Sequence, residues 1–389
     1  MPYPTKKLGE ITKIVGGGTP STKNESYWGS GHFWATPRDL AQLKITDINS
    51  TARTITEFGL EHSSAELLPV GSVILSSRAP IGYVAITTEL MAINQGCRAF
   101  ICGDEVNNRY LYYFLLISKK YLQSLGRGAT FTEINKSTLE KIEIPLPPIA
   151  TQKQIVERLD KIAEAQKLND ELIQKTEELF QSLLHKELNP AGPADAKAMA
   201  GKKDWEVKTI GDVCKIIGGG TPSREELKHF KGDIPWVTVK DLNILEIEDA
   251  LEHINKESLK NSAANLVPAD TILVVTRVGL GKVAITKKPL TFNQDIKGLI
   301  AGDGIDPRYL FYSILNIVPI IVKNGKGATV KGITQEFLKK IEISIPPLKT
   351  QKQIAAKLSA VQDYKKQLLG QKVKLKELFD SALAKSMKN

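Results

Sequence analysis

The sequence predicts a mixed α/β (α+β) protein with two similar globular domains separated by a pair of long helices. Three observations lead to this prediction. The chain of 389 residues repeats its own pattern at an offset near 200. Each repeat mixes short strand-like runs with helical segments, without the strict alternation that a doubly wound parallel sheet requires. Each repeat also ends in a long stretch that is almost free of Pro and Gly.

The internal repeat extends over nearly the whole chain. "GGGTPS" at 16–21 returns at 218–223, and "NQ" at 94–95 returns at 293–294. The offset changes from 202 to 199 inside one segment, which runs from Leu40 to Ile55 in the first copy. A two-copy repeat of this length is too long for a solenoid and indicates a tandem duplication with approximate two-fold character.

The duplication divides the chain into five parts. Residues 189–204 are rich in Ala, Gly and Pro, lack periodicity, and therefore read as a linker. The predicted order is a globular domain over 1–146, a long helix over 147–188, this linker, a second globular domain over 205–345, and a C-terminal long helix over 346–389.

Both long helices carry an apolar seam. The apolar residues recur about every 3.5 positions, which is the period of a helix that packs against another helix. A helix of about 38 residues would be about 57 Å long, so we expect it to act as a spacer. The predicted packing residues are Ile155, Leu159, Ile162, Leu172 and Leu183 in the first helix, and Ile354, Leu358, Val361, Leu368 and Leu375 in the second.

The charges of the two helices predict their partner. Residues 147–188 hold 6 basic and 8 acidic side chains, whereas residues 346–389 hold 10 basic and 3 acidic ones. Charge excesses of opposite sign favour pairing one helix with the other over self-pairing. We therefore expect an intramolecular antiparallel coiled coil; the alternative is that each helix only covers its own globular domain.

Each globular domain reads as a mixture of short elements. Strand-like runs such as "GSVILSS" and "GYVAIT" precede a helix that starts near "RYL" in both copies. In the second copy we expect Pro319 to interrupt that helix. "GGGTPS" lacks the Gly-Lys-Ser/Thr of a phosphate-binding loop, so we interpret it as a turn that uses the conformational freedom of glycine.

The search for catalytic chemistry finds no candidate. The five histidines do not cluster and none recurs in the other half, and no acidic cluster suggests a two-metal site. Asp39 and Asp241 do recur, and local hydrogen bonding or helix capping explains them. The three cysteines read as free buried thiols. Neither a signal peptide nor a membrane span is visible, so we expect a cytoplasmic protein.

Basic residues recur instead, and they are the candidate DNA contacts. The net charge of +10 points to a polyanionic partner, but each globular domain carries an excess of only two, so DNA contact requires a local patch. Arginine can address guanine with two parallel hydrogen bonds, and lysine suits phosphates. The candidates are Arg38, Lys44, Arg78, Arg127, Thr130, Lys240, Arg277, Lys326 and Thr329.

The segment of changed length is a further candidate. It runs over "AQLKITDINSTART" in the first copy and "NILEIEDALEH" in the second. If the scaffold is shared and the target is not, part of the surface that reads DNA lies in this segment. Exchange of the two segments without any change of sequence preference would remove this hypothesis.

Taken together, these motifs resemble a known family. The doubled pattern "GGGTPS", "W-x-T-x-[RK]-D-L", "GxVAI", "NQ", "RYL", "G[RK]GAT" and "TQKQI", with the two long helices, is similar to the specificity (S) subunit of type I restriction-modification systems. The resemblance implies that each globular domain is a target-recognition domain for one half of a bipartite, asymmetric target in double-stranded DNA. It also implies that the helices set the gap and dock two methyltransferase (M) subunits, which restriction (R) subunits join.

The same resemblance implies that this chain has no catalytic residues and no cofactor of its own. S-adenosylmethionine, ATP and magnesium would be used by the partner subunits, and no membrane is involved. Two other interpretations stay open. A two-domain scaffold could bind proteins through its helix pair without reading DNA. A stand-alone DNA-modifying enzyme would bind S-adenosylmethionine or a divalent metal by itself.

Overall fold

The computed structural model describes residues 3–43, 46–78, 80–126, 132–188, 204–327 and 332–387. The chain forms two compact units. Unit 1 consists of Met1–Asp170 and Gly370–Asn389, and unit 2 consists of Glu171–Leu369. Each unit contains one mixed α/β globular part together with a portion of both long helices, so the predicted fold class is confirmed.

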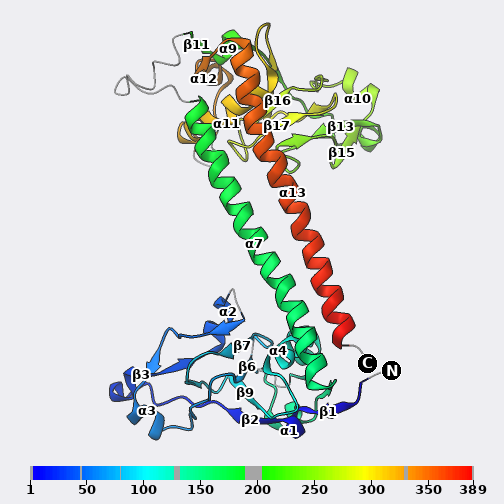
Figure 1. Cartoon of the computed structure of the whole chain (residues 1–389). Helices are drawn as coiled ribbons and strands as arrows, with labels where there is room; N and C mark the ends of the chain where they lie inside the picture. The colour runs from blue at the N-terminus through cyan, green and yellow to red at the C-terminus, as the bar shows by residue number, and fades with distance from the viewer. Residues whose placement is uncertain are drawn as a thin grey trace. The chain divides into compact units, whose positions relative to one another are not determined.

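A five-stranded sheet forms the centre of unit 1 (Figure 1). All neighbouring strands are antiparallel except β4 and β7, which are parallel. Strand β6 is buried along its whole length because residues on both of its faces meet apolar layers. The order is β2 (Thr12–Gly16), β9 (Cys97–Cys102), β6 (Val73–Ser76), β7 (Val84–Thr87) and β4 (Asp47–Ile48).

Two smaller sheets complete the strands of unit 1. The first has the order β5 (Thr54–Ile55), β3 (Trp28–Ala35) and β8 (Met91–Ile93). In the second, β1 (Thr5–Lys7) pairs antiparallel with β10 (Glu143–Pro145). This last pair ties the start of the domain to the residues that lead into the long helix.

Short helices cover the central sheet of unit 1. Helix α4 packs on β6 and β7, and it buries Tyr110, Leu111 and Phe114 in the core. The helical elements are α1 (Leu8–Ile11), η1 (Glu25–Tyr27), α2 (Pro37–Gln42), α3 (Glu57–Glu61), α4 (Asn108–Ile117), α5 (Lys119–Leu125) and α6 (Lys136–Glu140).

Unit 2 repeats this topology strand for strand, as the duplication predicts. Its five-stranded sheet has the order β12 (Cys214–Gly218), β19 (Ile296–Ala301), β16 (Ile272–Val275), β17 (Val283–Thr286) and β14 (Glu246–Ile247). Its other strands are β15 (Glu252–Ile254), β13 (Ile234–Val237), β18 (Thr291–Phe292), β11 (Glu206–Thr209) and β20 (Glu342–Ile345). Its short helical elements are α9 (Ile210–Val213), η2 (Leu227–Phe230), α10 (Lys256–Lys260), α11 (Pro307–Lys323) and α12 (Gln335–Lys339).

The expected break at Pro319 is wrong. Helix α11 runs through this proline without interruption, whereas the equivalent helix of unit 1 divides at Ser118. An internal proline costs a helix about 3 kcal/mol. Ile317 and Ile321 are buried on either side of Pro319, and their burial offsets this cost.

The long helices α7 (Ile149–Leu188) and α13 (Leu348–Met387) contribute to the core of unit 1. The first turns of α7 bury Leu159 and Ile162 in the same core as Leu383 and Met387 of α13. Farther along, the side-chain amide of Gln166 donates to the carbonyl oxygen of Leu375 at 3.1 Å. The C-terminal part of α13 therefore contributes to the core of the N-terminal unit.

The two helices also meet inside unit 2. Lys365 Nζ lies 2.5 Å from the carboxylate of Glu177, and Lys357 Nζ lies 3.3 Å from that of Glu187. In unit 1, Lys372 pairs with Asp170 at 2.9 Å. Residue numbers rise along α7 as they fall along α13, so the pairing is antiparallel in each unit. Every one of these pairs takes its lysine from α13 and its acid from α7, as the charge excesses predict.

The inward face of α7 differs from the apolar pattern in the sequence. Asn169, Thr176 and Phe180 are buried, whereas Leu172 is 42% exposed. Asn and Thr can be buried when their side chains are hydrogen-bonded. A pattern that counts only apolar residues therefore misses these positions. Among the other predicted packing residues, Leu159, Ile162, Ile354, Leu358 and Leu368 are buried, and Ile155, Leu183, Val361 and Leu375 are partly buried.

Within the part of the chain that the structure describes, no helix combines the length and the apolar content that a bilayer crossing requires.

Candidate functional site

Two of the "GGGTPS" glycines pack tightly against other backbone segments, Gly17 against the "NQ" turn and Gly18 against Ser64 and Ala65. A Cβ atom at Gly17 would lie 1.9 Å from the carbonyl oxygen of Asn94, and one at Gly18 would lie 2.3 Å from the nitrogen of Ala65. The equivalent contacts of Gly219 in unit 2 are as close. Glycine is therefore required for close approach of the backbone, and not for the positive φ that a permissive turn would need.

The "W-x-T-x-[RK]-D-L" motif fastens the same region. The indole of Trp34 donates to the carbonyl oxygen of Gly18 at 2.9 Å, and Trp236 makes the same bond to Gly220. Thr36 is the N-cap residue of α2, and Asp39 accepts from the Thr36 backbone at 2.9 Å in a capping box. The capping role predicted for Asp39 is confirmed. The side chain of the preceding residue, Arg38, is exposed.

Two further segments meet the "NQ" turn in unit 1. The backbone N–H groups of Ser77 and Arg78 both donate to the carbonyl oxygen of Gly96, at 2.9 and 3.2 Å. The N–H of Ile134 in turn donates to the carbonyl oxygen of Ser77 at 2.9 Å. Pro37, at the start of α2, lies against Gly96. Segments that are distant in sequence therefore converge at one edge of the central sheet.

We call this surface the motif edge, and unit 2 has one of the same design. There, the N–H of Thr276 donates to the carbonyl oxygen of Asp295, and that of Ile333 donates to the carbonyl oxygen of Thr276, both at 2.9 Å. The motif edge consists of Thr19, Arg38, Arg78, Gln95, Arg98 and Glu133 in unit 1, and of Thr221, Lys240, Arg277, Gln294, Asp295, Lys297 and Lys326 in unit 2.

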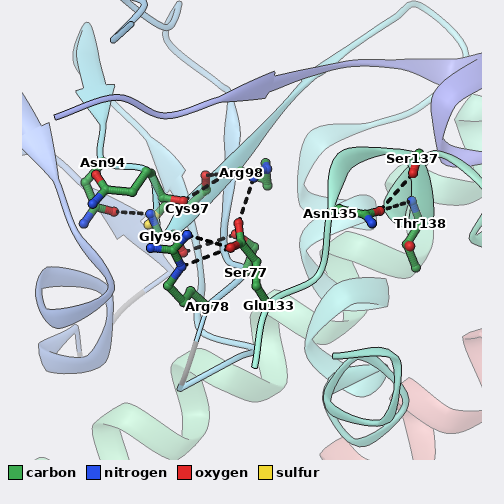
Figure 2. Close-up of polar contacts among 11 residues, drawn as sticks. Ser77, Arg78, Asn94, Gly96, Cys97, Arg98, Glu133, Asn135, Ser137 and Thr138 are labelled. Carbon is green, nitrogen blue, oxygen red and sulfur yellow. Dashed lines mark hydrogen bonds and ion pairs between the residues drawn. The ribbon is translucent and has the colours of Figure 1, made fainter. Parts of the chain in front are cut away.

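A carboxylate joins two arginines at the motif edge of unit 1 (Figure 2). One oxygen of Glu133 accepts from Arg78 Nη2 at 2.6 Å, and the other accepts from Arg98 Nη2 at 3.0 Å. The Arg98 side chain is only 15% exposed, whereas that of Arg78 is 38% exposed. The network thus runs from a nearly buried arginine on β9, through Glu133, to an arginine at the surface.

Unit 2 places its carboxylate elsewhere. Gly332 stands where unit 1 has Glu133, and Asp295 stands where unit 1 has Gly96. The Asp295 carboxylate lies 3.7 Å from Nε of Arg277, whose side chain is 58% exposed. The two motif edges thus share a scaffold but arrange their charged groups differently.

The segment of changed length carries a second difference between the units. Arg53 lies over the ring of Trp28, 3.6 Å from its centroid. Glu252 occupies the equivalent position in unit 2, where it accepts two hydrogen bonds from Arg224. Arg53 in unit 1 is thus replaced in unit 2 by Glu252, whose charge Arg224 neutralises.

Other basic residues that recur in the two copies lie elsewhere. Arg109 pairs with Asp160 at 3.0 Å, and its counterpart Arg308 pairs with Glu246 at 2.8 Å. Burial acts to raise the pKa of Glu246, but the hydrogen bond and charge of Arg308 outweigh it and lower that pKa. Lys44, Arg127, Thr130 and Thr329 lie outside the described residues.

Sequence reasoning missed Arg98, Glu133 and Arg53. Arg98 could have been found, because Lys297 repeats its charge at the common offset of 199. Glu133 and Arg53 have no counterpart of the same kind in the other half, so a search for repeated residues passes over them. Such unrepeated residues are the ones expected to differ if the two units read different sequences.

The thiols are free and shielded. Cys97 and Cys214 are buried and Cys102 is partly buried, and none is in a disulfide. Burial raises the pKa of Cys102 and of Cys214 to about 12. Among the described residues, no group of three or more His, Cys, Asp and Glu side chains is arranged to hold a metal ion.

Comparison with known proteins agrees with the duplication. A family model described as "Type I restriction modification DNA specificity domain" matches residues 2–178 and again residues 202–378. The specificity subunit of the MjaIX type I restriction enzyme from Methanocaldococcus jannaschii is 31% identical, over 89% of this chain and 83% of its own length. The EcoR124I/EcoR124II specificity subunit of Escherichia coli is 31% identical over 63% of this chain and 61% of its own length.

Solved structures show the same fold. The S subunit from M. genitalium superposes with a TM-score of 0.61 at 14% identity and covers 100% of this chain and 96% of its own. A chain from a structural study of complex assembly in the type I R-M system has a TM-score of 0.64 at 19% identity, with 100% and 98% covered.

Proposed function

The chain belongs to the family of type I restriction-modification DNA specificity proteins, and from this premise we propose that each unit reads one half of a bipartite, asymmetric sequence in double-stranded DNA. The observation that carries the proposal is the motif edge. It occurs twice on one scaffold, with different charged side chains in each copy. A shared scaffold with different readers is what two unlike half-sites require.

The chemistry of the motif edge suits DNA. Arg38 and Arg78 in unit 1, and Lys240, Arg277 and Lys326 in unit 2, bring cations to a surface of otherwise nearly balanced charge. Exposed Thr19 and Gln95 beside them supply neutral hydrogen-bonding groups. Contacts to phosphate would provide most of the affinity and a steep dependence on salt, and contacts to base edges would provide the specificity.

The chain itself is a specificity subunit, and its curated relatives carry that name. We propose that methyltransferase subunits, two of them, and restriction subunits bind to it, and that S-adenosylmethionine, ATP and magnesium are used by these partners. A cytoplasmic location, where DNA is available and thiols stay reduced, is part of the proposal.

Exposed apolar residues on the long helices support partner binding. In unit 2, Leu172 and Leu179 of α7 are 42% and 51% exposed, and Leu369 of α13 is 46% exposed. Where large exposed apolar side chains form a contiguous patch, they commonly mark an interaction surface. We propose that the helices dock the methyltransferase subunits there, in addition to setting the gap between the half-sites.

The test is methylation sequencing of a host that carries this chain with its methyltransferase partner. We expect one bipartite, asymmetric motif with a gap of fixed length, which disappears when this chain is deleted. Binding of a random DNA pool by the purified complex provides the second readout. If the complex assembles but methylates and binds DNA without any sequence preference, the chain is a protein scaffold and the proposal is wrong.

A further inference from the structure

Arg98 is held in place from several sides. Its Nη1 donates to the carbonyl oxygens of Gln95 and Cys97, at 3.1 and 2.9 Å, and its Nη2 donates to Oε1 of Glu133 at 3.0 Å. With 15% of its side chain exposed, Arg98 has little surface left for a ligand. It therefore serves as an anchor that fixes the Glu133 carboxylate relative to strand β9.

Glu133 then fixes Arg78. Its Oε2 accepts from Nε of Arg78 at 3.1 Å and from Nη2 at 2.6 Å. A guanidinium has five N–H donors in a rigid plane, and this contact occupies the side formed by Nε and one hydrogen of Nη2. The end of the plane, formed by Nη1 and the other hydrogen of Nη2, makes no hydrogen bond to any residue that the structure describes, and the side chain is 38% exposed.

We propose that Glu133 is a positioning residue for DNA reading and that Arg78, held by it, recognises a guanine in the half-site bound by unit 1. The proposal rests on the proposed function and names the residues and the base for one of its half-sites. The free end of the Arg78 guanidinium has the two parallel donors that match O6 and N7 of guanine in the major groove.

Positioning matters because arginine is flexible. A free arginine loses rotamer entropy when it orders on a base, and an arginine that is already ordered loses less. Without the carboxylate, Arg78 and Arg98 would also repel each other. With it, the three groups keep one net positive charge, so the carboxylate does not make the surface repel phosphates.

Unit 2 supplies the contrast. Its Arg277 meets Asp295 at 3.7 Å through Nε alone, and its side chain is 58% exposed. Arg277 is therefore free to follow a phosphate, and its base discrimination should depend little on Asp295. Asp295→Asn is accordingly the matched control for Glu133→Gln, since both changes remove one carboxylate charge beside an arginine of a motif edge.

The experiment measures the DNA preference of the full chain in complex with its methyltransferase partner, first as the wild type and then as Glu133→Gln, Arg78→Lys and Asp295→Asn. A library derived from the methylated motif, with each position of both half-sites randomised in turn, gives the discrimination at every base pair. Thermal unfolding and the salt dependence of binding to non-specific DNA are recorded for each variant.

We expect Glu133→Gln and Arg78→Lys to lower discrimination about 5- to 100-fold at the same single G·C pair. Discrimination at the other half-site should stay as in the wild type. Arg78→Lys keeps the charge and should keep the salt slope, whereas Glu133→Gln should lower the unfolding temperature slightly, because Arg78 and Arg98 then repel each other. Asp295→Asn should leave that G·C pair unchanged. Unchanged discrimination in both variants, or a uniform loss over both half-sites, would overturn the proposal. A wild-type complex without any motif would instead refute the proposed function.

Discussion

At the residue scale, the first glutamine of the "TQKQI" motif explains why each long helix starts where it does. Gln152 is fully buried, and its Nε2 donates to the carbonyl oxygens of Pro147 and Glu105, at 2.8 and 2.9 Å. Its Oε1 accepts from the N–H of Asn107 at 2.8 Å. Gln351 makes the equivalent three bonds in unit 2. The motif is thus a joint that fastens the helix to the globular part.

Replacing this glutamine should cost stability. Gln152→Leu keeps the approximate shape but leaves two carbonyl groups and one N–H group unsatisfied inside the protein, so we expect a loss of about 2–4 kcal/mol. Gln154→Leu, at an exposed position of the same turn, should change the free energy of unfolding by less than about 0.5 kcal/mol. Urea unfolding of both variants measures these changes. Equal losses of unfolding free energy would contradict the role of Gln152 in fastening the helix to the globular part.

The thiols should be slow to react. Because burial raises the pKa of Cys102 and Cys214 to about 12, well above the ordinary value of a thiol, the reactive thiolate is scarce at neutral pH. We expect iodoacetamide at pH 7.5 to label the native protein far more slowly than the protein unfolded in guanidinium. Mass spectrometry of the labelled peptides measures the rates, and labelling at the unfolded rate would show that the thiols are open to solvent.

At the element scale, the inward face of α7 can be tested with two adjacent residues. Phe180 is 4% exposed and lies in the core of unit 2, with its ring centroid 6.0 Å from that of Tyr312. Phe180→Ala should cost about 3–5 kcal/mol, because it removes a large buried ring and leaves a cavity. Leu179→Ala should cost less than about 0.5 kcal/mol, since its side chain is 51% exposed.

Thermal unfolding of the two variants distinguishes this seam from the apolar pattern in the sequence. The apolar period that joins the predicted packing residues Leu172 and Leu183 passes through Leu179 and omits Phe180. A larger loss for Leu179→Ala than for Phe180→Ala would mean that α7 is rotated relative to the face described above. Leu179→Ala should weaken binding of the methyltransferase subunit instead, if the exposed side chains dock that partner.

The ion pair of Glu177 and Lys365 predicts a dependence on pH. Burial acts to raise the pKa of Glu177, but hydrogen bonds from Lys365 and Gln181 outweigh it and lower that pKa below 4.5. The pair therefore stabilises the fold above pH 4.5, and this contribution is lost as the pH falls through the lowered pKa. Because both side chains are partly exposed, the contribution should be below about 1 kcal/mol.

Melting temperatures of the wild type and of Glu177→Gln measure this contribution. We expect the wild type to be more stable at pH 7, and the difference between the two proteins to shrink as the pH falls below 4.5 and through the lowered pKa of Glu177. A difference that stays constant over this range would mean that the carboxylate charge of Glu177 does not contribute.

At the scale of the whole molecule, each unit is built from residues that are distant in the chain. Ala382, Leu383 and Met387 lie in the core of unit 1, beside Leu159 and Ile162. Deletion of residues 370–389 should therefore destabilise the N-terminal domain, by roughly 1.5–3 kcal/mol for each buried Leu or Met side chain that is removed.

Hydrogen exchange locates the effect of this deletion. Peptides from 8–162 should lose protection in the truncated chain, although none of their residues has been removed. Peptides from 210–345, which belong to unit 2, should be affected less. Unchanged protection over 8–162 would show that the globular part of unit 1 folds without α13.

The sequence by itself determined the duplication, the mixed α/β class, the two long helices and their antiparallel pairing, because period, composition and charge excess are properties of short stretches. It also identified the capping role of Asp39, whose partner Thr36 is three residues away. These features depend on interactions that are local or that recur along an element, and a linear pattern records them directly.

Only the tertiary structure decided which charged residues meet. Arg78, Arg98 and Glu133 come from three segments whose contact depends on the closure of long loops, and no local spacing encodes that contact. The polar members of the α7 seam, Asn169 and Thr176, were likewise invisible to an apolar pattern. The charged cluster was invisible because its partners lie far apart in the chain. Thr176 was invisible for another reason: its hydroxyl donates to the carbonyl oxygen of Leu172 in its own helix at 2.7 Å, so a polar residue can be buried at a position where a search for apolar residues does not look.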